Sequence, residues 1–318
     1  MLSYLMSASR STGHTLGSAE SKRWKAQSSM ENLAPYGWVL LILILLLAAL
    51  WQAGVFNTSH QAPREQPGSC KVSKQMVFGS GVQVSMVGSC GNMLPKFVAQ
   101  FSGTNSYIGI PYYGTLYPAQ SITVSLWFKT TEPIITTSQL LNTASIGTDC
   151  VDGAYCMRMA NSSIYFGVRT PSGGWQSTYA ASTQLQSAQQ INGGNWNNVV
   201  GVYDGSKVYI YWDGTLENSV AATGAMLLDT NDITVADTFG ENYQGSISNV
   251  QIYNISLSAS EVQKLYDEGI GGVPLPLPNI EGWWPLNGDV VDYSGSGLNG
   301  GLTGVVMNSS WSSGYMTP

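Results

Sequence analysis

Five aromatic residues are the side chains of this sequence best suited to bind a sugar. They lie in segments that we expect to be loops or strand edges: Tyr112, Tyr113, Tyr117, Trp175 and Tyr179. An exposed aromatic ring can stack on the apolar face of a pyranose, whereas Tyr and Trp within strands more often belong to a core. These five positions are therefore the candidates for a carbohydrate-binding surface.

The titratable side chains favour binding over catalysis. The chain has only two histidines, His14 and His60, so a histidine-based triad or zinc site in the folded region is excluded. Glycoside hydrolysis needs paired carboxylates, yet the only adjacent acids, Asp267-Glu268, fall at the end of a predicted helix. A net charge of −6 also argues against a nucleic-acid partner. We assign no catalytic residue and expect a protein that is not an enzyme.

The composition predicts the kind of scaffold that holds these residues. Only 10% of the 318 residues are charged, and 36 are glycine. A helical bundle needs many more charged residues on its solvent-facing surfaces, since ordinary soluble chains contain about 25%. The composition is instead typical of a β-rich extracellular protein with many turns.

Short apolar or alternating runs recur every 8–12 residues between residues 97 and 253, which indicates antiparallel strands. The clearest runs are residues 122–128, 164–168, 198–203, 208–212 and 247–253. Asp204-Gly205 and Asp213-Gly214 are tight-turn dipeptides between such runs. One helix is expected after residue 258, because Ser258 and Glu261 form a capping box and Gly269 can end the helix. The pattern predicts an all-β sandwich.

Five separated motifs carry a family resemblance: FSGTNSYIGIP at 101–111, VSLWFK at 124–129, WNNVVGVYDG at 196–205, YWDG at 211–214 and GSISNVQIYN at 245–254. In this order, followed by the capped helix, they resemble the laminin G-like branch of the concanavalin A-like lectin/glucanase fold. The resemblance covers residues 97–270 and implies an antiparallel jelly roll. Glucanases of this fold carry a Glu-x-Asp-x-x-Glu spacing, which the sequence does not contain.

One motif of that family stands in an unusual place. The segment WWPLNGDVVDYSGSGLNG, residues 283–300, normally opens such a domain, but here it follows the helix and a proline-rich linker at 273–278. Only 18 residues remain after it, too few for a second sandwich. We therefore expect a circular permutation, in which residues 280–318 complete one sandwich spanning residues 97–318. Residues 283–286 should pair with the 97–130 region or with the strand at 247–253.

The resemblance also implies a structural calcium ion. Asp292 matches the acid of the family's Asp-x-Ser-Gly-x-Gly loop, and Asn299 and Asn249 would supply neutral oxygen ligands. Asn249 and the preceding Ser248 stand where the family often has acids, which lowers the expected affinity. An equal alternative is that Asp292 only caps an Asx-type turn.

The four cysteines and four glycosylation sequons suit an exported protein. The even cysteine count points to disulfides, and the spacing favours Cys70–Cys90 and Cys150–Cys156, with three connectivities open. Residues 57–96 are expected to be a polar linker followed by a small disulfide-bonded hairpin. The sequons lie at Asn57, Asn161, Asn254 and Asn308.

The N-terminal region predicts a membrane anchor. Residues 32–63 contain no charged residue, and the apolar stretch at 36–56 would span about 32 Å as a helix at ~1.5 Å per residue. Basic residues precede it, which places the bulk of the chain outside the cell. A plain signal anchor is one interpretation.

The segment KAQSSME at residues 25–31 resembles the archaeal class III signal peptide of type IV pilin-like proteins. That resemblance implies cleavage by a prepilin peptidase between Ala26 and Gln27, with Glu31 as the acidic fifth residue of the mature protein. Residues 1–26 would be a cytoplasmic leader, and residues 27–56 the pilin-like helix, which could pack into a filament.

Together these features predict a single-pass cell-surface protein or pilus component, in which an extracellular sandwich binds carbohydrate or a surface glycoprotein. Two alternatives stay open: a structural filament or envelope subunit without a specific ligand, and a glycan-degrading enzyme.

Overall fold

The computed structural model describes residues 34–52, 64–77, 81–91, 94–130, 137–149, 152–160, 163–171, 173–180, 196–236 and 243–308. The chain divides into two compact units, Met1–Thr58 and Ser59–Pro318, which are treated separately below. Ala26, Gln27, Glu31, Asn57, Cys150 and Asn161 lie outside the described residues.

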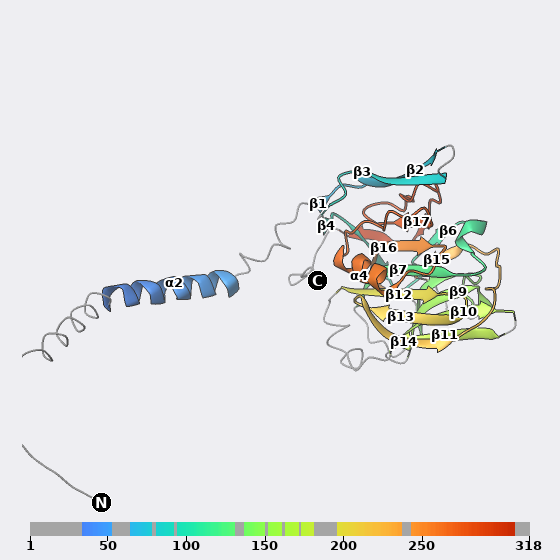
Figure 1. Cartoon of the computed structure of the whole chain (residues 1–318), viewed down its shortest axis with the longest axis horizontal. Coiled ribbons are helices and arrows are strands. Elements are labelled where there is room, and N and C mark those ends of the chain that lie inside the picture. The colour runs from blue at the N-terminus through green and yellow to red at the C-terminus, as the bar shows by residue number, and fades with distance from the viewer. Residues whose placement is uncertain are drawn as a thin grey trace, which may run out of the picture. The chain divides into compact units, whose positions relative to one another are not determined.

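The first unit contains helix α2, Ala34–Gln52 (Figure 1). Its sequence has no charged residue, and its large apolar side chains from Trp38 to Leu47 are exposed. No helix within the described part of the chain is long and apolar enough to cross a membrane.

The second unit is a sandwich of two large antiparallel sheets (Figure 1). The eight-stranded sheet has the order β14-β13-β12-β7-β16-β5-β19, with β17 also paired to β16. Its strands are β5 (Val98–Ser102), β7 (Ile122–Thr130), β12 (Asn197–Tyr203), β13 (Lys207–Trp212), β14 (Thr215–Ala221), β16 (Gln244–Tyr253), β17 (Ile280–Trp284) and β19 (Val306–Asn308). The five strand runs expected from the sequence are all present in the sandwich.

The seven-stranded sheet has the order β11-β10-β9-β8-β15-β6-β18. Its strands are β6 (Tyr107–Ile110), β8 (Ser138–Asn142), β9 (Tyr155–Ala160), β10 (Ser163–Thr170), β11 (Gly174–Ala180), β15 (Ile233–Val235) and β18 (Gly301–Thr303). A short 3-10 helix, η2 (Gly114–Leu116), follows β6.

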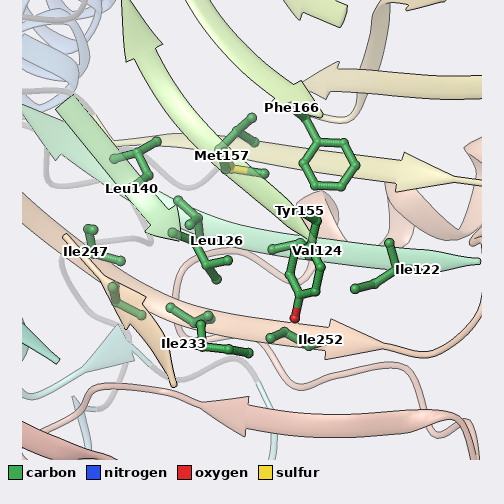
Figure 2. Close-up of a cluster of buried hydrophobic side chains, with 14 of the residues drawn as sticks. Ile122, Val124, Leu126, Leu140, Tyr155, Met157, Phe166, Ile233, Ile247 and Ile252 are labelled. Carbon is green, nitrogen blue, oxygen red and sulfur yellow. The ribbon is translucent and has the colours of Figure 1, made fainter. Parts of the chain in front are cut away.

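The main core lies between the two sheets. In Figure 2, side chains of β7 and β16, such as Leu126 and Ile252, lie close to side chains of β8, β9 and β10, such as Met157 and Phe166. All four are fully buried. This interdigitation follows from strand geometry, because alternate residues of each strand point to the same face.

The outer face of the eight-stranded sheet is covered as well. Helix α4 (Ala259–Asp267) begins with the predicted capping box, and its Val262 and Leu265 are buried against the sheet. Trp283 of β17 and Tyr253 of β16 belong to the same apolar cluster. The sandwich therefore carries a second, smaller core on its outer side.

A disulfide-bonded hairpin completes that second core. Strands β2 (Cys70–Val77) and β3 (Gly81–Gly88) pair antiparallel, and Cys70 is bonded to Cys90 as expected. The Val72 N–H donates to the carbonyl oxygen of Tyr293, 2.8 Å away. Two short strands, β1 (Arg64–Glu65) and β4 (Leu94–Pro95), pair beside it. The hairpin thus packs on the sandwich.

The C-terminal segment supplies strands to both sheets. Trp283 and Trp284 of β17 pair with β16, which confirms the pairing expected for this part of the chain. β18 pairs with β6, and β19 pairs with β5. Along one side of β16, its first half contacts β5 and its second half contacts β17. Residues 280–308 are therefore an integral part of the sandwich.

Candidate functional site

The predicted tyrosine loop and a polar loop meet at one end of the seven-stranded sheet. β6 ends at Ile110 where β15 begins at Ile233, and these two residues are partners in the antiparallel ladder. The loop after β6 and the loop before β15 must therefore lie side by side. The first carries Tyr112 and Tyr113, and the second carries Asn231 and Asp232.

Tyr112 and Tyr113 are the exposed aromatic residues of this surface, with 41% and 43% of their area accessible. The Tyr112 N–H donates to Asp232 Oδ1 at 2.9 Å, which joins the two loops. The Tyr112 ring lies 5.4 Å from that of Tyr117. We call Tyr112, Tyr113, Asn231 and Asp232 the tyrosine rim.

Tyr117 is not exposed, contrary to what the sequence predicted for a ligand-binding residue. Only 3% of Tyr117 is exposed, and its hydroxyl donates to the Asn231 carbonyl oxygen at 2.5 Å. Burial, followed by the nearby charges of Asp229 and Asp232, raises the pKa of Tyr117 well above its ordinary value, so the hydroxyl stays protonated. Tyr117 therefore fixes the polar loop through the Asn231 backbone and contributes no exposed ring to the rim.

The polar loop itself is tightly organised. Asp229 Oδ1 accepts from the Thr230 N–H at 2.7 Å and from Asn231 Nδ2 at 2.8 Å. The Ser145 hydroxyl, from the loop after β8, donates to Asn231 Oδ1 at 3.3 Å. These contacts use the Asn231 amide, whereas no donor among the described residues reaches Asp232 Oδ2. Sequence reasoning missed these residues, although the run at 229–232, which is entirely polar, was a visible signal.

The remaining two aromatic candidates lie elsewhere, on β11. Trp175 is partly buried, and its ring covers Gly167 of β10 so closely that a Cβ there would lie 2.4 Å from Trp175 Cζ2. One ring face is therefore taken by the protein. Tyr179 belongs to the same strand, but its side chain lies outside the described residues. The structure does not bring these two residues to the tyrosine rim.

Asp292 lies in the loop after β17 and organises it. Its Oδ1 accepts from the N–H groups of Trp283 (3.0 Å) and Ser294 (2.8 Å). Its Oδ2 accepts from the Ser294 hydroxyl (3.0 Å) and the Leu298 N–H (2.9 Å). The Asp292 N–H in turn donates to Asn299 Oδ1 at 2.9 Å. The carboxylate thus receives four hydrogen bonds from its own segment.

Asn249 is connected to this loop through Trp283, whose indole N–H donates to Asn249 Oδ1 at 2.8 Å. Gln251 Nε2 donates to the same oxygen at 3.0 Å. Asn249 has a left-handed φ of 52° at an irregularity in the β16 ladder, a conformation that asparagine tolerates well. Trp283 therefore links the Asp292 loop to Asn249.

These three residues do not fit a calcium site as they are arranged. Calcium takes six to eight oxygen ligands, but the side-chain oxygens of Asp292 and Asn249 face N–H and O–H donors, whose positive ends would repel a cation. Within the described residues, no group of three or more His, Cys, Asp or Glu side chains could hold a metal ion. The contacts correspond to the alternative in which Asp292 fixes a turn, and we derive no role for calcium.

The predicted modification sites are only partly described. Cys156 is disulfide-bonded, and its predicted partner lies outside the described residues. Asn254 is half-buried, and its Nδ2 donates to Glu281 Oε1 at 2.6 Å. Asn308 is the last residue of β19, but its side chain is outside the described part. Glycosylation of the sequons stays a prediction.

Comparison with known families agrees with the two-sheet architecture. Residues 102–263, just over half of the chain, match a laminin G family model described as the concanavalin A-like lectin/glucanases superfamily. The chain belongs to this superfamily. The match ends before β17, so the C-terminal strands of this concanavalin A-like domain lie beyond the matched region. No match is found among curated proteins.

Solved structures with a similar fold include a candidate carbohydrate-binding protein from Bacteroides ovatus. It is 12% identical, with a TM-score of 0.50, and the match covers 83% of this chain and 84% of that one. A heptameric SAP-like pentraxin from Limulus polyphemus is 14% identical, with a TM-score of 0.46 over 67% of this chain and 95% of that one. At these identities the likeness concerns the fold alone.

Proposed function

We propose that this concanavalin A-like domain is a binding module that recognises carbohydrate through the tyrosine rim. The observation that carries the proposal is the pair of neighbouring side chains, Tyr112 and Tyr113, which are both more than 40% exposed on a loop joined to Asp232. A preorganised loop loses less conformational entropy on binding than a free one. The rings offer apolar surface to a sugar, and Asp232 Oδ2 can accept a hydrogen bond from a sugar hydroxyl.

The proposed setting is the cell surface. The uncharged stretch at residues 32–63, the basic segment before it and the cysteine usage support export, with the N-terminal segment retained as a membrane anchor or filament element. A prepilin peptidase would cleave before Gln27. Mass spectrometry of protein extracted from its native membrane should then give Gln27 as the first residue. A mature protein that begins at Met1, or beyond residue 56, would exclude the pilin-like form.

The test of ligand recognition uses the full chain in a non-ionic detergent on an array of neutral and acidic glycans. Wild-type protein should bind a defined subset of glycans. Tyr112→Ala combined with Tyr113→Ala should weaken that binding at least about tenfold, since truncating a central aromatic residue costs more than about 1.4 kcal/mol.

The matched control replaces both tyrosines by phenylalanine, which keeps the rings and should preserve most of the affinity. Equal binding by the double alanine variant would refute the rim as the site. Absence of binding to any glycan would favour the structural filament or envelope subunit. Release of reducing sugar from a bound glycan would favour the glycan-degrading enzyme.

A further inference from the structure

A separate hollow lies on the outer face of the eight-stranded sheet, where β12 and β13 meet the residues that begin α4. Its volume is about 370 Å³, within the range of about 300–1,000 Å³ that is usual for small-ligand sites. We call it the helix-side hollow. None of the residues that line it belongs to the tyrosine rim.

Two carboxylates, Asp204 and Glu261, line the helix-side hollow, and no Lys or Arg does. Burial opposes ionisation of Asp204, but hydrogen bonds from Ser206, Lys207 and Tyr209 together hold its pKa below the ordinary value. Hydrogen bonds from Ser258, and then the charge of Lys264 on the same helix, lower the pKa of Glu261 as well. Both groups are therefore ionised at neutral pH, and the hollow is negatively charged.

The hydrogen-bonding capacity of Asp204 is already used by its own hairpin. Asp204 Oδ1 accepts from the N–H and the hydroxyl of Ser206, both at 2.8 Å, and from the Lys207 N–H at 2.7 Å. Asp204 Oδ2 accepts from the Tyr209 hydroxyl at 3.0 Å. Asp204 consequently offers a ligand its charge rather than free acceptor positions, and charge selects a cation over a neutral polyol.

One of the two carboxylate oxygens of Glu261 likewise already accepts hydrogen bonds from its own segment. Its Oε2 accepts from the Ser258 N–H at 2.8 Å and from the Ser258 hydroxyl at 2.7 Å. Its Oε1 has no hydrogen-bond donor among the described residues. The capping box thus fixes the carboxylate at the start of α4, with one oxygen available to a donor.

Tyr211 is the second observation that points to a ligand. Only 5% of this residue is exposed, it lines the hollow, and its hydroxyl has no hydrogen-bond partner in the described part of the chain. The hydroxyl itself is not fully enclosed, so a molecule in the hollow, water or a ligand, can reach it and form its hydrogen bond. Val202 and Leu257 add apolar surface beside it. The lining therefore combines an apolar wall, two aromatic side chains and two negative charges.

We propose that the helix-side hollow binds an alkylammonium group, of the kind that a lysine side chain of a partner protein presents. The apolar stem would lie against Val202 and Leu257. The ammonium group would donate to Glu261 Oε1 and the Tyr211 hydroxyl, in the field of Asp204. Aromatic side chains attract such cations in addition. This cation-binding activity is distinct from carbohydrate binding at the tyrosine rim.

The experiment measures binding by ligand-observed NMR titration of the full chain in a non-ionic detergent. The probes are Nα-acetyl-lysine methylamide, the uncharged analogue Nα-acetyl-norleucine methylamide, n-butylamine and methyl glucoside. We expect the lysine probe to bind with a dissociation constant on the order of 1 mM, and more weakly as salt screens the carboxylates. Tighter binding than butylamine would indicate a peptide-borne lysine, and equal binding an alkylammonium group from any source; both support the site.

Matched variants separate charge from folding. Glu261→Gln keeps a capping box but removes the charge. It should weaken binding of the lysine probe at least fivefold, and Asp204→Asn should do the same. Tyr112→Ala at the rim should leave binding of the lysine probe unchanged. Equal binding of the norleucine analogue, no binding of the lysine probe, or binding of methyl glucoside that is lost only in Tyr211→Ala would overturn the proposal. None of these outcomes depends on whether the rim binds glycans.

Discussion

Replacing Asp292 by alanine should destabilise the sandwich severely. The change removes the acceptor of three backbone N–H groups, those of Trp283, Ser294 and Leu298, at distances of 2.8–3.0 Å. All three residues are buried, with at most 3% of each exposed. An unsatisfied buried donor costs about 1–3 kcal/mol, so the loss is about 3–9 kcal/mol before any water enters the space left behind.

Water entry would reduce that cost, so we expect a loss near the lower end of this range, about 3 kcal/mol, out of a typical total stability of about 5–15 kcal/mol. For a domain of this size, about 3 kcal/mol lowers the melting temperature by roughly 6–12 °C. The stability of Asp292→Asn should lie between those of the wild type and the alanine variant, because asparagine keeps one acceptor oxygen. Urea unfolding of the full chain in non-ionic detergent, monitored by tryptophan fluorescence, measures the order of the three free energies of unfolding.

The same assay with added calcium or a chelator separates the two roles considered for Asp292. If Asp292 fixes the turn by hydrogen bonds alone, neither addition should move the unfolding midpoint of the wild-type protein. A midpoint that rises with calcium in wild type but not in Asp292→Asn would refute this reasoning and restore the calcium site. An alanine variant within about 0.5 kcal/mol of wild type would refute the energetic argument.

Two further predictions concern the sheet. Burial, and to a smaller extent the charge of Glu217, raises the pKa of Asp213 to about 6. The folded state therefore binds this proton more tightly than the unfolded state does. The free energy of unfolding should then fall as pH rises from about 4 to above 6. Asp213→Asn should remove that dependence in urea unfolding from pH 4 to 7, and parallel curves would contradict it. A Cβ on Gly201 would lie 2.1 Å from the Phe166 ring, so Gly201→Ala should cost about 1–3 kcal/mol. Gly109→Ala, whose nearest neighbour is 3.9 Å away, is the control, and equal melting temperatures of the two variants would be the contrary result.

The strands of the sandwich were predictable because local pattern and tertiary environment agree. The run at 122–128 alternates between two faces that are both covered, and it lies within β7. The capping box of Ser258 and Glu261 sets the start of α4 by local hydrogen bonds alone. The pairing of residues 283–284 within the sandwich could be predicted because two tryptophans would otherwise be exposed to water, although the sequence left β16 and the 97–130 region as alternative partners.

The residues of the two proposed sites were less predictable, since their positions depend on contacts between distant segments. Tyr117 and Tyr112 are of the same residue type in one loop, yet only the packing of the polar loop decides that Tyr117 is buried. The helix-side hollow joins the β12–β13 hairpin to the start of α4, so no short motif contains it. Strand alternation does put Tyr209 and Tyr211 on one face, but it does not say that α4 leaves an opening beside them.

β18 and β19, which cover the edges of β6 and β5, lie late in the chain, and this order has a consequence for biosynthesis. β5 ends at Ser102, but the strand that extends its side of the sheet, β19, emerges only with residues 306–308. At about 5–20 residues per second, this part of the sheet waits at least about 10 s after β5 has been made. During that time β5 and β6 have open edges that invite pairing with other chains. The nascent protein should therefore need a holding chaperone until β18 and β19 have emerged, and ribosome-bound chains that stop before residue 280 should remain protease-sensitive.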